Sequence, residues 1–242
     1  MSLTEHLEEL RTTVIRVVIV ILGSFVLAYS FGEYIAEALL TPLRNALEND
    51  PSGKVVYLGL LDKVLSQLQV AFWSSIIISS PLWFYEVWRF VKPGLYDHEI
   101  KAVRPFICVG FVLFLLGVAF GYFLVFPLTF DILLSFGVKN VEATISLKEY
   151  LVLSSKVLVL LGLLFQLPNA MLILGFMGIV TKQSLRNMRG YIYVGLAVAS
   201  AVLTPPDPMT MMALWFPMVL LFELGLLAVA GIVHPYLARQ HS

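Results

Sequence analysis

The feature that most constrains this chain is a series of long apolar runs separated by short polar segments. About 20 residues in a helix cross the ~30 Å hydrocarbon core of a bilayer. Hydrophobic residues make up 59% of the chain and charged residues 13%, against about 25% charged residues in soluble domains. The sequence therefore predicts an all-α integral membrane protein with six transmembrane helices, forming a single polytopic domain over residues 1–242. The predicted spans are residues 14–31, 64–91, 103–128, 150–177, 189–203 and 209–233.

Two polar stretches are predicted to be helical without crossing the bilayer. Residues 1–13 place three leucines on one helical face, which is typical of a short amphipathic helix. Apolar residues at every fourth position from Ile35 to Leu47 indicate a second helix along the membrane interface, which Pro42 is expected to bend or break. Three glutamates precede the first arginine, so no cleaved signal peptide is expected.

The distribution of basic residues predicts the orientation. Six spans place both termini on one side of the membrane. Of the 16 lysines and arginines, ten lie in loops or at span ends on the side of the termini, five lie on the other side, and Lys156 lies further inside a span. Cytoplasmic loops carry an excess of basic residues, so both termini are predicted to be cytoplasmic. The loop at residues 83–104 then shares this face with the N-terminal helix.

Glu9 and Glu99 are the first candidate binding residues, because both are acidic on a face that is otherwise biased towards positive charge. A carboxylate binds a guanidinium group through paired, charge-assisted hydrogen bonds, so two carboxylates on a rigid frame could recognise two arginines. The alternative is that Glu9 pairs with nearby basic residues and Glu99 with Lys92 or Lys101. Because exposed ion pairs are common, the residues alone favour this alternative.

Three further polar residues lie in or next to the predicted spans. Gln166 and Glu223 lie near the middle of the fourth and sixth spans, where a polar side chain must face the bundle interior or a hydrated cavity. An interhelical hydrogen bond that fixes packing is the favoured interpretation of Gln166, whereas packing and function are equally consistent with Glu223. Asp207 follows prolines in the last turn and is predicted to cap the sixth helix.

Sequence patterns typical of enzymes are missing. The chain contains neither G-x-x-x-x-G-K-[ST] nor G-x-S-x-G, and its four histidines do not have metal-ligand spacing. Its formal net charge of zero does not indicate a nucleic-acid partner. We therefore expect a protein that is not an enzyme and that needs no cofactor or metal. A proton-coupled small-solute transporter, with Glu223 as the coupling group, is an alternative, although the six spans show no internal repeat.

Several motifs occur in an order that resembles one family, the C subunit of the twin-arginine protein translocase, TatC. They run from residue 6 to residue 223, and the ordered set is specific although each motif alone is weak. The motifs are His6-Leu-Glu-Glu-Leu-Arg11, Ser80-Pro81, Tyr85-x-x-Trp-x-Phe90-x-x-Pro93-x-Leu-Tyr96-x-His98-Glu99, Phe123-x-x-Phe126-Pro127-Leu128, Phe165-x-x-Pro168, Leu203-Thr-Pro-Pro-Asp207 and Phe222-Glu223.

The resemblance implies a fold and a function. The family is described as a concave, glove-shaped bundle of six helices in the bacterial cytoplasmic membrane. It acts as the core receptor of a machine that exports folded proteins bearing twin-arginine signal peptides, using the proton gradient. The family's signal-peptide site maps onto two carboxylates and five residues that shape the site: Glu9, Glu99, Arg11, Phe90, Pro93, Tyr96 and His98.

The resemblance also implies partners. The family works with single-span TatA- and TatB-type subunits and is expected to self-associate in the complex. Gln166 and Glu223 are candidate partner contacts within the membrane, and Pro205 with Asp207 forms the family's outer turn. Many members have glutamate where this chain has Gln166, so hydrogen bonding rather than charge is expected to matter at this position.

Overall fold

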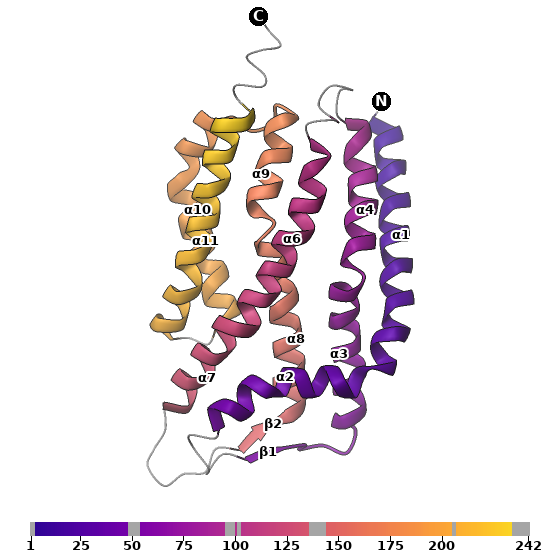
Figure 1. Cartoon of the computed structure of the whole chain (residues 1–242), viewed down its shortest axis with the longest axis vertical. Helices are drawn as coiled ribbons and strands as arrows, with labels where there is room; N and C mark the ends of the chain where they lie inside the picture. The colour runs from indigo at the N-terminus through magenta and orange to yellow at the C-terminus, as the bar shows by residue number, and fades with distance from the viewer. Residues whose placement is uncertain are drawn as a thin grey trace, which may run out of the picture. The chain divides into compact units, whose positions relative to one another are not determined.

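The computed structural model describes residues 3–47, 54–94, 100, 103–135, 144–204 and 207–233. These residues form helices and one two-stranded sheet (Figure 1). The chain divides into two compact units. Unit 1 consists of Met1–Trp83 and Gly117–Leu161, and unit 2 consists of Phe84–Leu116 and Gly162–Ser242.

The elements of each unit follow from this division. Unit 1 contains α1 (Leu3–Ser30), α2 (Gly32–Leu47), β1 (Lys54–Val56), α3 (Asp62–Ile78), the π-helical turn η2 (Gly121–Val125), α7 (Phe126–Ser135) and β2 (Thr144–Ser146). Unit 2 contains η1 (Lys92–Gly94), α9 (Leu167–Phe176), α10 (Lys182–Leu203), α11 (Pro208–Ala228) and the π-helical turn η3 (Val229–Val233). Three helices have residues in both units: α4 (Ser80–Val91), α6 (Pro105–Phe120) and α8 (Leu147–Leu164).

Four helical segments of the described chain are long and apolar enough to cross a membrane, and α3 with α4 adds a fifth if this bent pair is one span. The four are Leu7–Ser30, Pro105–Phe130, Leu147–Phe176 and Pro208–Val233. The predicted span 189–203 lies in α10, which is not among them. Lys182, Arg186 and Arg189 occupy the first part of α10, so only its second part is continuously apolar.

The predicted division between an N-terminal amphipathic helix and the first span is wrong, because α1 is one continuous helix of 28 residues. The segment contains no proline, and its one glycine, Gly23, is not at the expected boundary. Nothing in the backbone therefore stops the helix where its composition changes. The candidate span begins at Leu7, so Glu9 lies in its first turn.

Pro42 does not end α2, which continues to Leu47. Proline has no N–H to donate to the carbonyl four residues earlier, here that of Ala38. The hydroxyl of Tyr122 donates to this carbonyl at 2.7 Å, and the hydroxyl of Tyr150 donates to the next one, that of Leu39, at 2.6 Å. Two tyrosines thus hold α2 crosswise at the ends of α1 and α3 (Figure 1).

The second predicted span is interrupted at Ser79, where α3 and α4 meet at an angle of 56°. Pro81 causes the interruption, because it cannot donate to the carbonyl of Ile77. The hydroxyl of Ser80 donates to that carbonyl instead, at 2.6 Å. The indole N–H of Trp83 donates to the carbonyl of Ile76 at 2.9 Å, so side chains replace the lost backbone bonds.

The two strands were not predicted. β1 and β2 pair in parallel over three residues each, too few to give a periodic pattern. The first residues of α3 and α8 are tied together beside them, because the ammonium group of Lys148 lies 2.9 Å from the carboxylate of Asp62. Asp62 also accepts the N–H of Gly59 at 2.7 Å. This arrangement forms a platform on the side of unit 1 where α1 ends and α2 begins.

We expect the buried Tyr150 to contribute more to this platform than the half-buried Tyr122. Tyr150→Phe removes a buried hydrogen bond to α2 and should lower the free energy of unfolding by about 1 kcal/mol. Tyr122→Phe should cost less, because water can reach the carbonyl of Ala38. Unfolding of both variants in mixed detergent micelles measures the difference. An equal or larger loss in Tyr122→Phe would contradict this account of how α2 is held.

Candidate functional site

Glu9 combines partial burial with an unsatisfied acceptor. It lies on α1, and its Oε2 atom is buried without a hydrogen-bond partner in the part of the chain that the structure describes. A buried acceptor without a donor costs roughly 1–3 kcal/mol, and more when it is charged. The alternative in which Glu9 is held by a neighbouring cation is therefore not seen among these residues. Oε2 of Glu9 therefore lacks a donor within the described part of the chain.

The other predicted signal-peptide residues divide into three sets. Arg11 is exposed and lies one helical turn from Glu8 on α1 of unit 1. Phe90 lies in the last turn of α4, and Pro93 lies in η1. Both residues belong to unit 2. Since the residues belong to different units, their assembly into one site stays a prediction. Three predicted residues, Tyr96, His98 and Glu99, lie outside the described residues.

Gln166 lies between α8 and α9, where Pro168 interrupts the fourth predicted span because it has no N–H to donate. Its amide Nε2 donates to the carbonyl of Gly110 on α6 at 2.9 Å, and its Oε1 accepts from Nδ2 of Asn169 at 3.3 Å. Oδ1 of Asn169 is buried without a partner among the described residues. This group therefore ties α6 to α9 and leaves one acceptor unused.

Gly110 is required for this contact. A Cβ atom at this position would lie 2.4 Å from Nδ2 of Asn169 and 3.1 Å from Oε1 of Gln166. The missing side chain allows both amides to reach the backbone of α6. Sequence reasoning did not identify Gly110, because a single glycine in an apolar helix does not show which carbonyl its neighbours bind.

Both oxygens of the Glu223 carboxylate are bound by α10. Nη2 of Arg189 lies 2.6 Å from Oε2, and the hydroxyl of Tyr193 donates to Oε1 at 2.5 Å. The indole N–H of Trp215 donates to the carbonyl of Tyr193 at 2.9 Å, and the ring of Phe222 meets that of Tyr193 edge-on. The interhelical interpretation of Glu223 is therefore seen directly.

Arg189 and Tyr193 were missed as partners of Glu223. Their spacing of four residues places them on one face of α10, which is the signal that could have identified them. Because its carboxylate is fully engaged, Glu223 is not favoured as the coupling group of a small-solute transporter. Gln166 and Glu223 belong to different hydrogen-bonded groups within the described part of unit 2.

Asp207 caps α11, as predicted. Its Oδ2 accepts the backbone N–H of Thr210 at 2.7 Å, and Pro208 occupies the first helical position. This hydrogen bond lowers the pKa of the Asp207 carboxyl, because it favours the ionised form. Pro205 lies outside the described residues. The cap therefore has a structural role, because it fixes the start of α11.

A family model decides the identity of the chain. The model for the Sec-independent protein translocase protein, TatC, matches residues 5–217. This chain belongs to the TatC family. It is therefore a protein translocase subunit of the Tat system and a multi-pass membrane protein, which is not an enzymatic role.

Curated and solved TatC proteins are similar over most of their length. The TatC protein of Magnetococcus marinus is 39% identical over 230 residues, which cover 95% of this chain and 84% of that protein. TatC of Escherichia coli K12 is 33% identical over 224 residues, which cover 92% of this chain and 86% of that protein. A crystal structure of the twin-arginine translocase receptor TatC in DDM has a TM-score of 0.82 and 31% identity, with 92% of this chain and 98% of that chain covered.

The ion pair between Arg189 and Glu223 should couple the two residues energetically. Arg189→Met should destabilise the protein more when Glu223 is present than in combination with Glu223→Gln, because the single variant leaves a carboxylate with one donor. We expect a coupling of about 1 kcal/mol in a double-mutant cycle measured by unfolding in detergent. Additive effects of the two substitutions would show that the contact does not fix the packing of α10 on α11.

The Asp207 cap should make stability depend on pH. The folded-state pKa lies below the ordinary value of 3.8, so the stabilisation is present above this value and is lost as the pH falls through the folded pKa. The difference in unfolding temperature between the wild type and Asp207→Asn should therefore be constant above about pH 5 and change below about pH 4. A difference that is constant from pH 7 to pH 3 would contradict the cap's charge dependence.

Proposed function

We propose that this chain is the receptor subunit that binds twin-arginine signal peptides of folded proteins at the cytoplasmic face and initiates their export, driven by the proton gradient. The observation that carries this proposal is the buried, unpartnered carboxylate oxygen of Glu9. Such an atom is costly unless a donor reaches it. An incoming arginine side chain supplies that donor together with the opposite charge.

The chemistry of two adjacent arginines suits two separate carboxylates. A guanidinium group presents its N–H donors in a planar fork that matches a carboxylate, and it stays charged at every physiological pH. In an extended peptide, consecutive side chains point in opposite directions. Glu9 binds one arginine and Glu99 the other. Arg11, Phe90, Pro93, Tyr96 and His98 shape the space around the peptide.

The proposal places the site on the cytoplasmic side of the bacterial inner membrane. With six spans, ten of the 16 basic residues lie on the side of the termini, which supports cytoplasmic termini. α10 is the additional span beyond the four or five apolar ones. Its basic residues, among them Lys182 and Arg186, can extend towards the membrane surface while the apolar second part crosses the hydrocarbon.

Gln166 and Glu223 are proposed contacts for the single-span TatA- and TatB-type partners. The unpartnered Oδ1 of Asn169, next to Gln166, motivates this role, because a donor on a partner helix would satisfy it once the Asn169 side chain turns outward. Glu223 contributes less directly, by fixing α10 against α11 through Arg189 and Tyr193. Copies of this chain are expected to associate within the same complex.

Glu9→Gln should weaken binding of a twin-arginine peptide by about 10- to 100-fold, because a hydrogen bond to a charged group contributes roughly 1.5–3 kcal/mol. Titration of the purified protein in detergent with a fluorescent signal peptide measures the change. Export of a folded reporter in cells should fall in parallel, with the amount of protein in the membrane unchanged.

Glu8→Gln is the matched control. Glu8 is the adjacent acidic residue on α1, and it is exposed. The control removes the same charge one position away and should leave peptide affinity within about twofold, as an exposed charge contributes little. Equal weakening in both variants would show that only net charge matters, and wild-type affinity in Glu9→Gln would reject Glu9 as a ligand of the peptide.

A further inference from the structure

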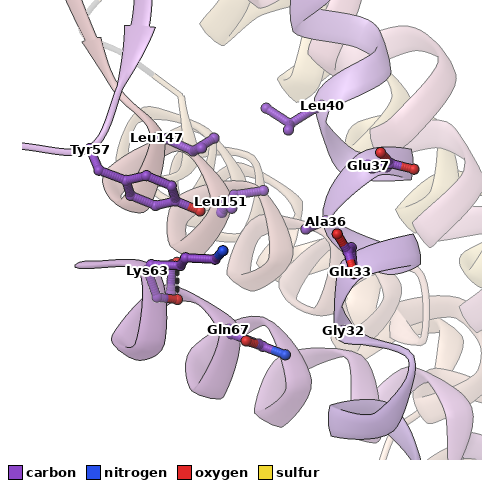
Figure 2. Close-up of a pocket in the computed structure, with 11 residues that line it drawn as sticks. Gly32, Glu33, Ala36, Glu37, Leu40, Tyr57, Lys63, Gln67, Leu147 and Leu151 are labelled. Atoms are coloured by element: carbon purple, nitrogen blue, oxygen red, sulfur yellow. Dashed lines mark hydrogen bonds between the residues drawn. The ribbon is translucent and has the colours of Figure 1, made fainter. Parts of the chain in front are cut away.

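A cavity of about 400 Å³ lies in unit 1 between α2, the first turns of α3 with the segment before it, and the beginning of α8 (Figure 2). This volume falls in the range of about 300–1,000 Å³ that is typical of small-molecule sites. Figure 2 shows Glu33 and Leu40 of α2 on one side and Tyr57, Lys63 and Gln67 on the other. None of the residues assigned to the signal-peptide site or to partner contacts lines this cavity.

The cavity lies at the level where the hydrocarbon ends. The first candidate span ends at Ser30, directly before α2, and the bent candidate span begins at Asp62. A third candidate span begins at Leu147, which itself lines the cavity. Because three span ends within unit 1 adjoin the cavity, it lies at the level of the headgroup region on the side opposite the N-terminus.

The polar walls of the cavity carry opposite charges. Glu33 on α2 lies across from Lys63 on α3, and Glu37, one turn further along α2, also lines the cavity. In the described structure none of these three side chains forms an ion pair or hydrogen bond. The hydroxyl of Tyr57 and the amide of Gln67 add neutral donors beside Lys63. The site is thus suited to a group that carries both a cation and an anion.

An apolar segment joins Tyr57 to Lys63, two residues that line the cavity. Leu58, Leu60 and Leu61 follow Tyr57 and are 68%, 98% and 65% exposed. Contiguous exposed leucines are unfavourable in water and indicate contact with acyl chains when they lie at a membrane interface. Within the cavity, Leu40 and Leu151 form a buried apolar floor. The combination requires a ligand with a zwitterionic head and a hydrocarbon tail.

We propose that this cavity binds the headgroup of a phospholipid with a primary ammonium group, a phosphatidylethanolamine. The ammonium donates to the carboxylates of Glu33 and Glu37, and the phosphate accepts from Lys63 and Tyr57. A quaternary choline group has no N–H to donate to these carboxylates, and an anionic lipid lacks the positive charge that they attract. The acyl chains lie against Leu60 and its neighbours.

A peptide amino terminus would also suit the two carboxylates, but it leaves two features unused. Lys63 would repel a peptide ammonium group, whereas it attracts the phosphate of a lipid. The exposed leucines at residues 58–61 would stay without an apolar partner. A bound lipid uses both, and it joins α2 to α3 at the position where α2 lies crosswise on the platform.

Native mass spectrometry of the full chain tests the proposal directly. The purified protein is equilibrated with equal amounts of phosphatidylethanolamine, phosphatidylcholine and phosphatidylglycerol of distinct mass, and the retained lipids are compared. We expect the wild type to retain phosphatidylethanolamine about fivefold over each of the others, a moderate preference in keeping with partly exposed charges. The double variant Glu33→Gln/Glu37→Gln should lose this preference, and Lys63→Gln should lower retention of both zwitterionic lipids.

Arg44→Gln is the matched control, because Arg44 is an exposed charge on α2 that does not line the cavity. It should behave as the wild type, and size-exclusion profiles should show that every variant is folded. Equal retention of the three lipids by the wild type would overturn the proposal. So would a preference for phosphatidylglycerol, or binding of a short peptide with a free amino terminus that depends on Glu33 and Glu37 without any lipid preference.

Discussion

The structure depends on one constraint: a backbone or side-chain polar group that is removed from water must find a partner within the protein. A proline inside a helix leaves one backbone carbonyl without its N–H donor, and in this chain a side chain donates to that carbonyl instead. At Pro42 the freed carbonyl of Ala38 receives the hydroxyl of Tyr122, and at Pro81 the carbonyl of Ile77 receives that of Ser80. These repairs allow α2 to continue through its proline and allow α4 to follow α3 at an angle.

The same constraint marks buried polar atoms without a partner as candidate binding groups. Glu223 has both carboxylate oxygens bound and so fixes the packing of two helices. Glu9 and Asn169 each keep one buried oxygen without a donor in the described parts of the chain. The proposed function requires contacts with a signal peptide at the surface and with partner helices within the membrane. Unsatisfied acceptors at these positions fit that requirement, because a partner's donor removes a cost that the isolated chain bears.

The sequence predicted the features that depend on composition or on local backbone chemistry. Apolar runs identified the helical segments, and Asp207 was recognised as a cap because capping needs only residues three positions apart. Features that depend on distant residues were not predicted. Arg189 was counted only as a basic residue of the cytoplasmic side, because nothing local shows that α10 meets Glu223. The strands β1 and β2 are too short to give a period, and continuity of α1 overrode its change in composition.

The central claim is that a buried carboxylate oxygen of Glu9 binds an arginine of the signal peptide. Its most direct test is a double-mutant cycle on peptide affinity, combining Glu9→Gln with replacement of each of the two arginines by glutamine in turn. The account predicts a coupling free energy of about 1.5–3 kcal/mol with one of the two arginines. Coupling below about 0.5 kcal/mol with both arginines, which is the range of independent sites, would contradict it.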